Sequence, residues 1–214
     1  MLNLNRVDLV IIDCVNPEKA VATLKICTEK INFANVKILT NHDLPDCKFE
    51  LIKIAEINTI EQYSDFCLKL TKYFTNEYLL LVQNDGFIIN PELWDDDFLN
   101  FDYIGAPWNS TCVPGHRIGN GGFSLRSKKF LEFSATFDST SGVPEDNFLC
   151  IHNYQNALDY GILFPPLKLA SLFAYEYHNP YAWTFNPKNH FGFHGKENVS
   201  IAKKFILNKN LGSI

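Results

Sequence analysis

The sequence predicts an α/β fold with a mainly parallel central sheet flanked by helices. In the first 90 residues, four runs of β-branched and aliphatic residues alternate with two stretches of helical periodicity, in the order strand, helix, strand, strand, helix, strand. The 214 residues are 46% hydrophobic and 20% charged, which is enough to bury a core on both faces of such a sheet. No proline- or serine-rich linker interrupts the chain, so we expect one domain over residues 1–214, with halves at 1–90 and 91–214.

The start of the chain predicts a strand followed by a helix. Val7–Ile12 is a β-branched run that ends at Asp13. Pro17 suits the first position of a helix, and Glu18 supplies an acid to its first turn. The apolar stripe of this helix continues at helical spacing to Ile31.

Three more strands and a second helix complete the first half. We expect strands at Val36–Leu39, Phe49–Ile54 and Tyr78–Val82, and a helix whose apolar stripe runs from Ile60 to Phe74. In a parallel sheet, the ligand crevice lies beyond the carboxyl ends of the strands. The residues that follow these ends, and that we expect to line one crevice, are Asp13, Thr40, Asn41, Gln83, Asn84 and Asp85.

The second half is richer in Gly, Pro, Trp and Asn, and its strands are shorter. Tyr103–Trp108 predicts a strand that leaves through a proline turn. We expect one helix to begin at Ser127 and another to open at Pro144 and end near Gly161.

Several residues are candidates for chemistry, and each also has a structural explanation. Asp85 stands in an Asp-Gly turn, which is common turn chemistry but also offers a carboxylate to a hard divalent cation. Glu145 and Asp146 occupy the first turn of a helix, where the macrodipole favours acids and where a general base is well placed. His194 lies between two glycines and gains a role only if the C-terminal segment folds over Asp85.

The glycines of the segment 119–122 flank Asn120 and permit close backbone approach to a ligand. Among the three tryptophans, Trp108 is the candidate substrate platform because it follows the proline turn. The pair Lys203-Lys204 is typical of a solvated helix face.

Composition excludes several classes. A net charge of −5 argues against a nucleic-acid or anionic-membrane partner. The chain shows neither a signal peptide nor an apolar stretch near the ~20 residues of a membrane helix, so we expect a cytoplasmic protein. The six cysteines form no CxxC pair, which indicates reduced thiols rather than a zinc ribbon.

Together these segments resemble the GT-A glycosyltransferases, a Rossmann-like class that uses nucleotide-sugar donors. More narrowly, they resemble a domain-of-unknown-function family assigned to that superfamily. The resemblance covers about residues 78–195 and rests on the motifs QNDGF (83–87), YIGAPW (103–108), GNGGFSLRS (119–127), PED (144–146) and FGFHG (191–195).

The resemblance implies a nucleotide-binding half at 1–90 and an acceptor and catalytic half, rich in Gly and aromatic residues, at 91–214. GT-A enzymes hold Mn²⁺ or Mg²⁺ through an Asp-X-Asp motif and often a C-terminal His. Here the first acid of that triplet is replaced by Gln83, so the implied metal ligands are Asp85 and His194.

The implied reaction is transfer of a sugar from a donor, most commonly UDP-linked, to a hydroxyl of a saccharide or glycoconjugate acceptor, with inversion as the expected outcome and retention as the open alternative. Asp146 is the implied base, with Glu145 as its alternative, and Trp108 and Arg117 are the expected acceptor contacts. The implied donor-binding residues are Asp13, Thr40, Gln83, Asn84, Asp85, Asn120, Gly121 and Gly122.

Two alternatives remain open at this point. The missing first acid favours a catalytically degenerate GT-A module that binds glycans without turnover. A nucleotidyltransferase shares the Rossmann-like half, but it requires a glycine-rich basic loop after the first strand, and residues 13–17 contain neither glycine nor lysine.

Overall fold

The computed structural model describes residues 1–110, 113 and 115–211. At its centre is a six-stranded sheet with the strand order β3-β2-β1-β4-β6-β5. Strands β1 to β4 pair in parallel, and β6 is antiparallel to both β4 and β5. The predicted α/β class with a mainly parallel sheet is therefore confirmed. The strands are β1 (Leu2–Ile12), β2 (Ile31–Thr40), β3 (Glu50–Lys53), β4 (Tyr78–Val82), β5 (Tyr103–Gly105) and β6 (Ser124–Ser127).

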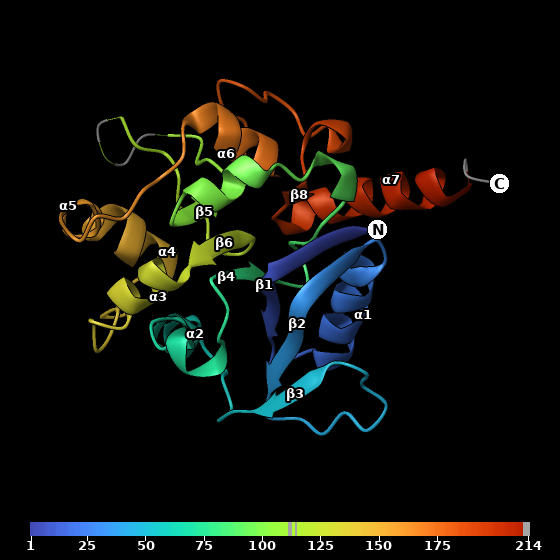
Figure 1. Cartoon of the computed structure of the whole chain (residues 1–214), viewed down its shortest axis with the longest axis horizontal. Helices are drawn as coiled ribbons and strands as arrows, with labels where there is room; N and C mark the ends of the chain where they lie inside the picture. Colours follow the sequence, from blue (N-terminus) through green and yellow to red (C-terminus); the bar gives the residue numbers. More distant parts are fainter. Residues whose placement is uncertain (111–112, 114, 212–214) are drawn as a thin grey trace.

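Helices cover both faces of this sheet (Figure 1). Successive side chains of a strand point to opposite faces, and in β1 the alternation sends Leu9 and Ile11 into one core cluster and Val10 and Ile12 into the other. The first cluster includes residues of α1 (Pro17–Thr28) and α7 (Val199–Leu211). The second includes residues of α2 (Ile60–Cys67), α3 (Lys128–Ser134) and α5 (Tyr154–Asp159).

The remaining elements lie in the second half of the chain. They are α4 (Glu145–Asn147), a π-helical turn (Phe148–His152), α6 (Leu167–Phe173), β7 (Ala174–Tyr175) and β8 (Gly192–Phe193), with 3-10 turns at Leu70–Tyr73, Pro91–Leu93, Asp96–Asn100, Pro187–Asn189 and Lys196–Asn198. Strands β7 and β8 form a separate parallel pair in which Tyr175 is opposite Phe193. This register places the next residues along each strand, Glu176 and His194, beside one another.

Some predicted boundaries were wrong. The first helix ends at Thr28 rather than reaching Ile31, because Ile31 already pairs with Leu2 at the start of β2. The stripe from Ile60 to Phe74 is not one helix, since α2 ends at Cys67 and a 3-10 turn follows.

Other boundaries were nearly correct. The strand predicted over Tyr103–Trp108 ends at Gly105. Ser127 is the N-cap of α3, its hydroxyl accepting a hydrogen bond from the backbone N–H of Phe130. Gly161 adopts a φ of 86°, a left-handed conformation that favours glycine where the helical segment ends.

The helices in the described part of the chain are all too short or too polar to cross a membrane. Cys14, Cys27, Cys47, Cys67 and Cys150 are free thiols, and Cys112 lies outside the described residues.

Candidate active site

A cleft of about 760 Å³ opens at the carboxyl ends of β1 and β4, where the sequence predicts a ligand crevice. The polar and charged residues that line it include Asp13, Asn16, Lys19, Asn58, Gln83, Asn84, Asp85, Lys196 and Lys203. Thr40 and Asn41 do not line it. Thr40 is fully buried at the end of β2, where its hydroxyl accepts a hydrogen bond from the backbone N–H of His42.

Asp13 connects the two strand ends that form the floor of the cleft. Its Oδ2 accepts a hydrogen bond from the Nδ2 of Asn84, which follows β4. Its Oδ1 accepts from the backbone N–H groups of Val15, at 2.8 Å, and Asn16, at 2.6 Å. The Asp13 carboxylate therefore orders the turn into α1 and fixes it to the end of β4.

His194 lies beside Gln83 and Asp85, two residues that line the cleft, and the β7–β8 pairing brings it there. Its Nδ1 is 2.8 Å from the Oε1 of Glu176, and its Nε2 is 3.2 Å from the Oε1 of Gln83 and 3.6 Å from the Oδ1 of Asp85. Burial by itself lowers the pKa of His194, but the two carboxylates outweigh burial and raise the pKa to about 9.

Two glycines make room for the His194 ring. A Cβ on Gly86 would lie 2.8 Å from its Cδ2, and a Cβ on Gly122 would lie 2.0 Å from its Nε2. Both distances are shorter than van der Waals contact allows. Gly86 and Gly122 are therefore the residues that admit the ring, which gives the QNDGF and GNGGF motifs a common structural reason.

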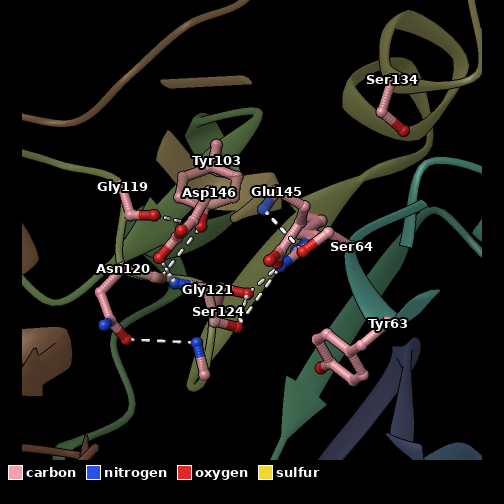
Figure 2. Close-up of polar contacts among 12 residues, drawn as sticks. Tyr63, Ser64, Tyr103, Gly119, Asn120, Gly121, Ser124, Ser134, Glu145 and Asp146 are labelled. Atoms are coloured by element: carbon pink, nitrogen blue, oxygen red, sulfur yellow. Dashed lines mark hydrogen bonds and ion pairs between the residues drawn. The ribbon is translucent and has the colours of Figure 1, made fainter. Parts of the chain in front are cut away.

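Glu145 and Asp146 face different surroundings although they are adjacent in sequence (Figure 2). Glu145 is 4% exposed, its Oε1 pairs at 2.7 Å with the Nη2 of Arg126, and its backbone N–H donates to the hydroxyl of Ser64. Arg126 is itself 1% exposed and lies over the ring of Tyr103. The Glu145 carboxylate is thus occupied by a buried ion pair.

Within the described residues, the hydrogen bonds to the Asp146 carboxylate come from backbone groups alone. Its Oδ2 accepts from the N–H of Gly121 at 3.0 Å, and its Oδ1 accepts from the N–H of Asn147 at 2.8 Å. Burial, followed by the negative charge of Glu145, raises the pKa of Asp146 to about 7. Of the two predicted acids, Asp146 is therefore the one in position to exchange a proton near neutral pH.

The backbone of Gly121 and Gly122 lies between Asp146 and His194, and we call this pair the Gly121–Gly122 wall. A Cβ on Gly121 would lie 3.1 Å from the Cβ of Asp146, whereas a Cβ on Gly122 would strike His194. Consecutive Cα atoms are about 3.8 Å apart. The glycine segment thus places Asp146 on one side of a thin backbone wall and His194 on the other.

Comparison with known proteins identifies the family. Residues 46–194 match the model of the family described as "Protein of unknown function (DUF5672)". The chain belongs to this family. No curated protein matches it.

Solved structures show which fold this DUF5672 protein has. The galactosyltransferase LgtC, in complex with donor and acceptor sugar analogues, aligns with a TM-score of 0.53 and 12% identity over 97% of this chain and 96% of that chain. The inositol-1-phosphate CTP transferase from T. maritima aligns with a TM-score of 0.49 and 13% identity over 73% and 82% of the two chains. A glycosyltransferase involved in the glycosylation of the major capsid of PBCV-1 aligns at 0.48 and 14% over 94% and 98%. The DUF5672 chain therefore has the GT-A fold of LgtC.

Trp108 and Arg117, the predicted acceptor contacts of this DUF5672 protein, do not line the cleft. The Trp108 ring packs on Gly119, where a Cβ would lie 2.1 Å from its Cη2. Its backbone N–H donates to the carbonyl of Arg117, whose guanidinium donates to the carbonyl of Asn109. Trp108 therefore packs against Gly119, at the start of the glycine segment. Its role toward an acceptor stays a prediction.

Glu176 is one site residue that sequence reasoning missed. It is 7% exposed, and its two oxygens connect His194 to Asn120, whose Nδ2 donates to its Oε2 at 2.5 Å. Asn120 in turn accepts from the N–H of Gly122. Its position follows from the pairing of two strands of two residues each, for which no sequence signal exists.

The implied metal ligands, Asp85 and His194, do lie together. In the described ranges, however, no group of three or more His, Cys, Asp or Glu side chains is arranged to hold a metal ion. Gln83 directs its amide nitrogen to Tyr63, so its Oε1 accepts from the Nε2–H of His194, while the Glu176 carboxylate accepts from the Nδ1–H. A metal ion could bind a ring nitrogen of His194 only by displacing its proton and one of these hydrogen bonds. The residues present do not fit a resident Mn²⁺ or Mg²⁺.

Proposed function

We propose that this protein is a glycosyltransferase that moves a sugar from a nucleotide-sugar donor, UDP-linked, to a hydroxyl of a saccharide or glycoconjugate acceptor. The observation that carries the proposal is Asp146, a carboxylate with a pKa raised to about 7, separated by the Gly121–Gly122 wall from a polar cleft at the strand ends. A carboxylate that titrates near neutral pH is suited to accept the proton of an acceptor hydroxyl that lies within hydrogen-bonding distance of it.

The cleft supports the donor assignment by its size and chemistry. Its volume of about 760 Å³ lies within the ~300–1,000 Å³ typical of small-molecule sites. The Oδ1 of Asn84 is buried without a hydrogen-bond partner among the described residues, so it can accept a hydrogen bond from a base or ribose at the strand ends. We assign the sugar contacts to Asn120, Gly121 and Gly122, because the N–H of Gly121 is hydrogen-bonded to Asp146 and the N–H of Gly122 to Asn120.

The proposed reaction is a single displacement at the anomeric carbon. The acceptor oxygen forms the new bond to that carbon, the bond from the carbon to the diphosphate oxygen breaks, and the nucleoside diphosphate leaves. The proton of the acceptor hydroxyl moves to the Asp146 carboxylate. Because attack and departure occur on opposite faces of the sugar, the configuration inverts.

Replacing the base tests this assignment. Asp146→Asn keeps the size of the side chain but removes its basicity, so turnover of a nucleotide-sugar, followed as nucleoside diphosphate released, should fall about 10²- to 10⁴-fold. Donor affinity should stay unchanged. The matched control is Asp46→Asn, an exposed carboxylate in the loop between β2 and β3, which should leave turnover at the wild-type level. Full turnover by Asp146→Asn would exclude Asp146 as the base.

A GT-A module that binds glycans without catalysis is the second candidate. It is favoured by the single acid of the Gln83–Asp85 triplet and by the hydrogen bonds that occupy both ring nitrogens of His194. Hydrolysis or transfer of any nucleotide-sugar would exclude it. The nucleotidyltransferase alternative has no support in the turn after β1, which still lacks glycine and lysine.

A further inference from the structure

Three lysines from different elements border the cleft. Lys19 belongs to α1, Lys196 to the turn after β8, and Lys203 to α7. All three are exposed. Among the residues that the structure describes, none of the three has a carboxylate within ion-pair distance. Their ammonium groups are therefore available to a ligand.

The two acids that line the same cleft are already engaged. Asp13 accepts hydrogen bonds from Asn84 and from two backbone N–H groups, and Asp85 lies 3.6 Å from His194. The whole chain carries a net charge of −5, whereas the cleft is lined by three lysines and two aspartates and so has a positive net charge. Such a concentration of positive charge in a concave site attracts anions.

The position of Lys203 is specific to one side of α7. Val199 and Lys203 are four residues apart, on the same side of the helix, and both line the cleft. Lys204 is equally exposed but does not line it. The sequence expectation that both lysines belong to a solvated face thus holds for Lys204, whereas Lys203 borders the site.

We propose that Lys19, Lys196 and Lys203 bind the diphosphate of the donor directly, so that donor binding by this protein requires no divalent cation. The proposal rests on the proposed function, since it assigns the charge that holds the donor. An ammonium group binds phosphate oxygens as a point charge. Lysines fixed beside the diphosphate also stabilise the negative charge that develops on it as the bond to the sugar breaks.

The test is equilibrium binding of inorganic pyrophosphate and of UDP, GDP, CDP and ADP to the full chain, measured in EDTA and again in excess Mn²⁺. We expect pyrophosphate and at least one nucleotide to bind in EDTA, with an affinity that Mn²⁺ changes by less than about tenfold, the factor that corresponds to one charge-assisted contact. Added salt should weaken this binding, because exposed charges are screened.

Variants assign the binding to the lysines. Lys196→Met and Lys203→Met should each weaken pyrophosphate and nucleotide binding about tenfold. Lys203→Arg should retain it, because the charge remains. The matched control is Lys204→Met, the next residue on the same helix, which should bind like the wild type. Since all these side chains are exposed, the melting temperatures should agree.

The outcomes separate the two proposals. Nucleotide binding only in Mn²⁺ would overturn the lysine proposal and leave the proposed function standing. Equal affinities of Lys203→Met and Lys204→Met would likewise overturn it. If neither pyrophosphate nor any of the four nucleotides binds in either buffer, both proposals fail.

Discussion

The charged side chains on the two sides of the Gly121–Gly122 wall differ in whether an oppositely charged side chain neutralises them. On the Arg126 side, the buried guanidinium and the Glu145 carboxylate neutralise one another at 2.7 Å, shielded from solvent. On the cleft side, His194 is held by Glu176 and approached by Asp85, and the lysines beyond it have room for a ligand. Asp146 belongs to neither pair, since in the part of the chain that the structure describes its carboxylate accepts hydrogen bonds from backbone N–H groups alone. The comparison teaches that a paired charge stabilises the fold, whereas a charge left without a side-chain partner is available for chemistry.

The largest expected effect comes from breaking the pair on the Arg126 side. Glu145→Gln leaves the Arg126 guanidinium buried without a counter-charge, which should lower the free energy of unfolding by about 3–5 kcal/mol. Urea denaturation measures it. The control is Glu77→Gln, which breaks the Arg6–Glu77 pair of similar length, 2.6 Å, whose side chains are 50% and 61% exposed. That change should cost less than about 1 kcal/mol. Equal losses in the two variants would remove the distinction between the buried pair and an ordinary surface pair.

The next effect concerns the cleft side, where Glu176 positions His194. The raised pKa of His194 stabilises the fold below pH 6.5, and this contribution disappears as the pH rises through about 9. Glu176→Gln should lower the pKa of His194 toward its ordinary value and cost about 1.5–3 kcal/mol at neutral pH. NMR titration of the imidazole protons checks the shift. Glu197→Gln, an exposed neighbour in the following turn, should change neither quantity. An unchanged His194 titration in Glu176→Gln would contradict the positioning role.

A third effect has the opposite sign, because this substitution should stabilise the fold rather than destabilise it. Because the pKa of Asp146 is raised in the folded state to about 7, its contribution to stability is present below pH 3.8 and is lost as the pH rises through about 7. Asp146→Asn cannot ionise, so its stability should vary less with pH over that window. Above pH 7 it should be at least as stable as the wild type. Thermal denaturation across this pH range measures the difference, and a variant that is less stable at every pH would show that the carboxylate supports the fold instead.

Local sequence patterns predicted the residues at the floor of the cleft and the position of the proposed base, Asp146. The ends of β1 and β4 are set by short apolar runs, so Asp13 and Gln83–Asp85 were placed at one crevice from sequence. The position of Asp146 was also predictable from local sequence, since it lies in the first turn of a helix that follows Pro144. Thr40 does not line the cleft because its side chain is buried under the end of β2, and a difference of one residue reverses the side to which a strand residue points. Its donor-binding role stays a prediction.

The positions of Glu176 and of the cleft lysines depend on contacts between segments that are distant in the sequence. Glu176 meets His194 only through the pairing of β7 and β8, which are too short to carry an alternating pattern. Lys19 and Lys203 meet at the cleft because α1 and α7 pack on the same face of the sheet. Periodicity along the chain contains no information on which helices become neighbours, so these residues were found only in the structure.

The central claim is that Asp146 acts as the base of a sugar transfer, and the most direct test is the pH dependence of kcat/KM for nucleotide-sugar turnover. The account predicts that kcat/KM rises with pH and reaches its plateau above a pKa of about 7, because only the ionised carboxylate accepts the proton. In Asp146→Asn this limb should be absent and the remaining rate low. A wild-type profile that is flat through pH 7, or the same limb in Asp146→Asn, would contradict the account.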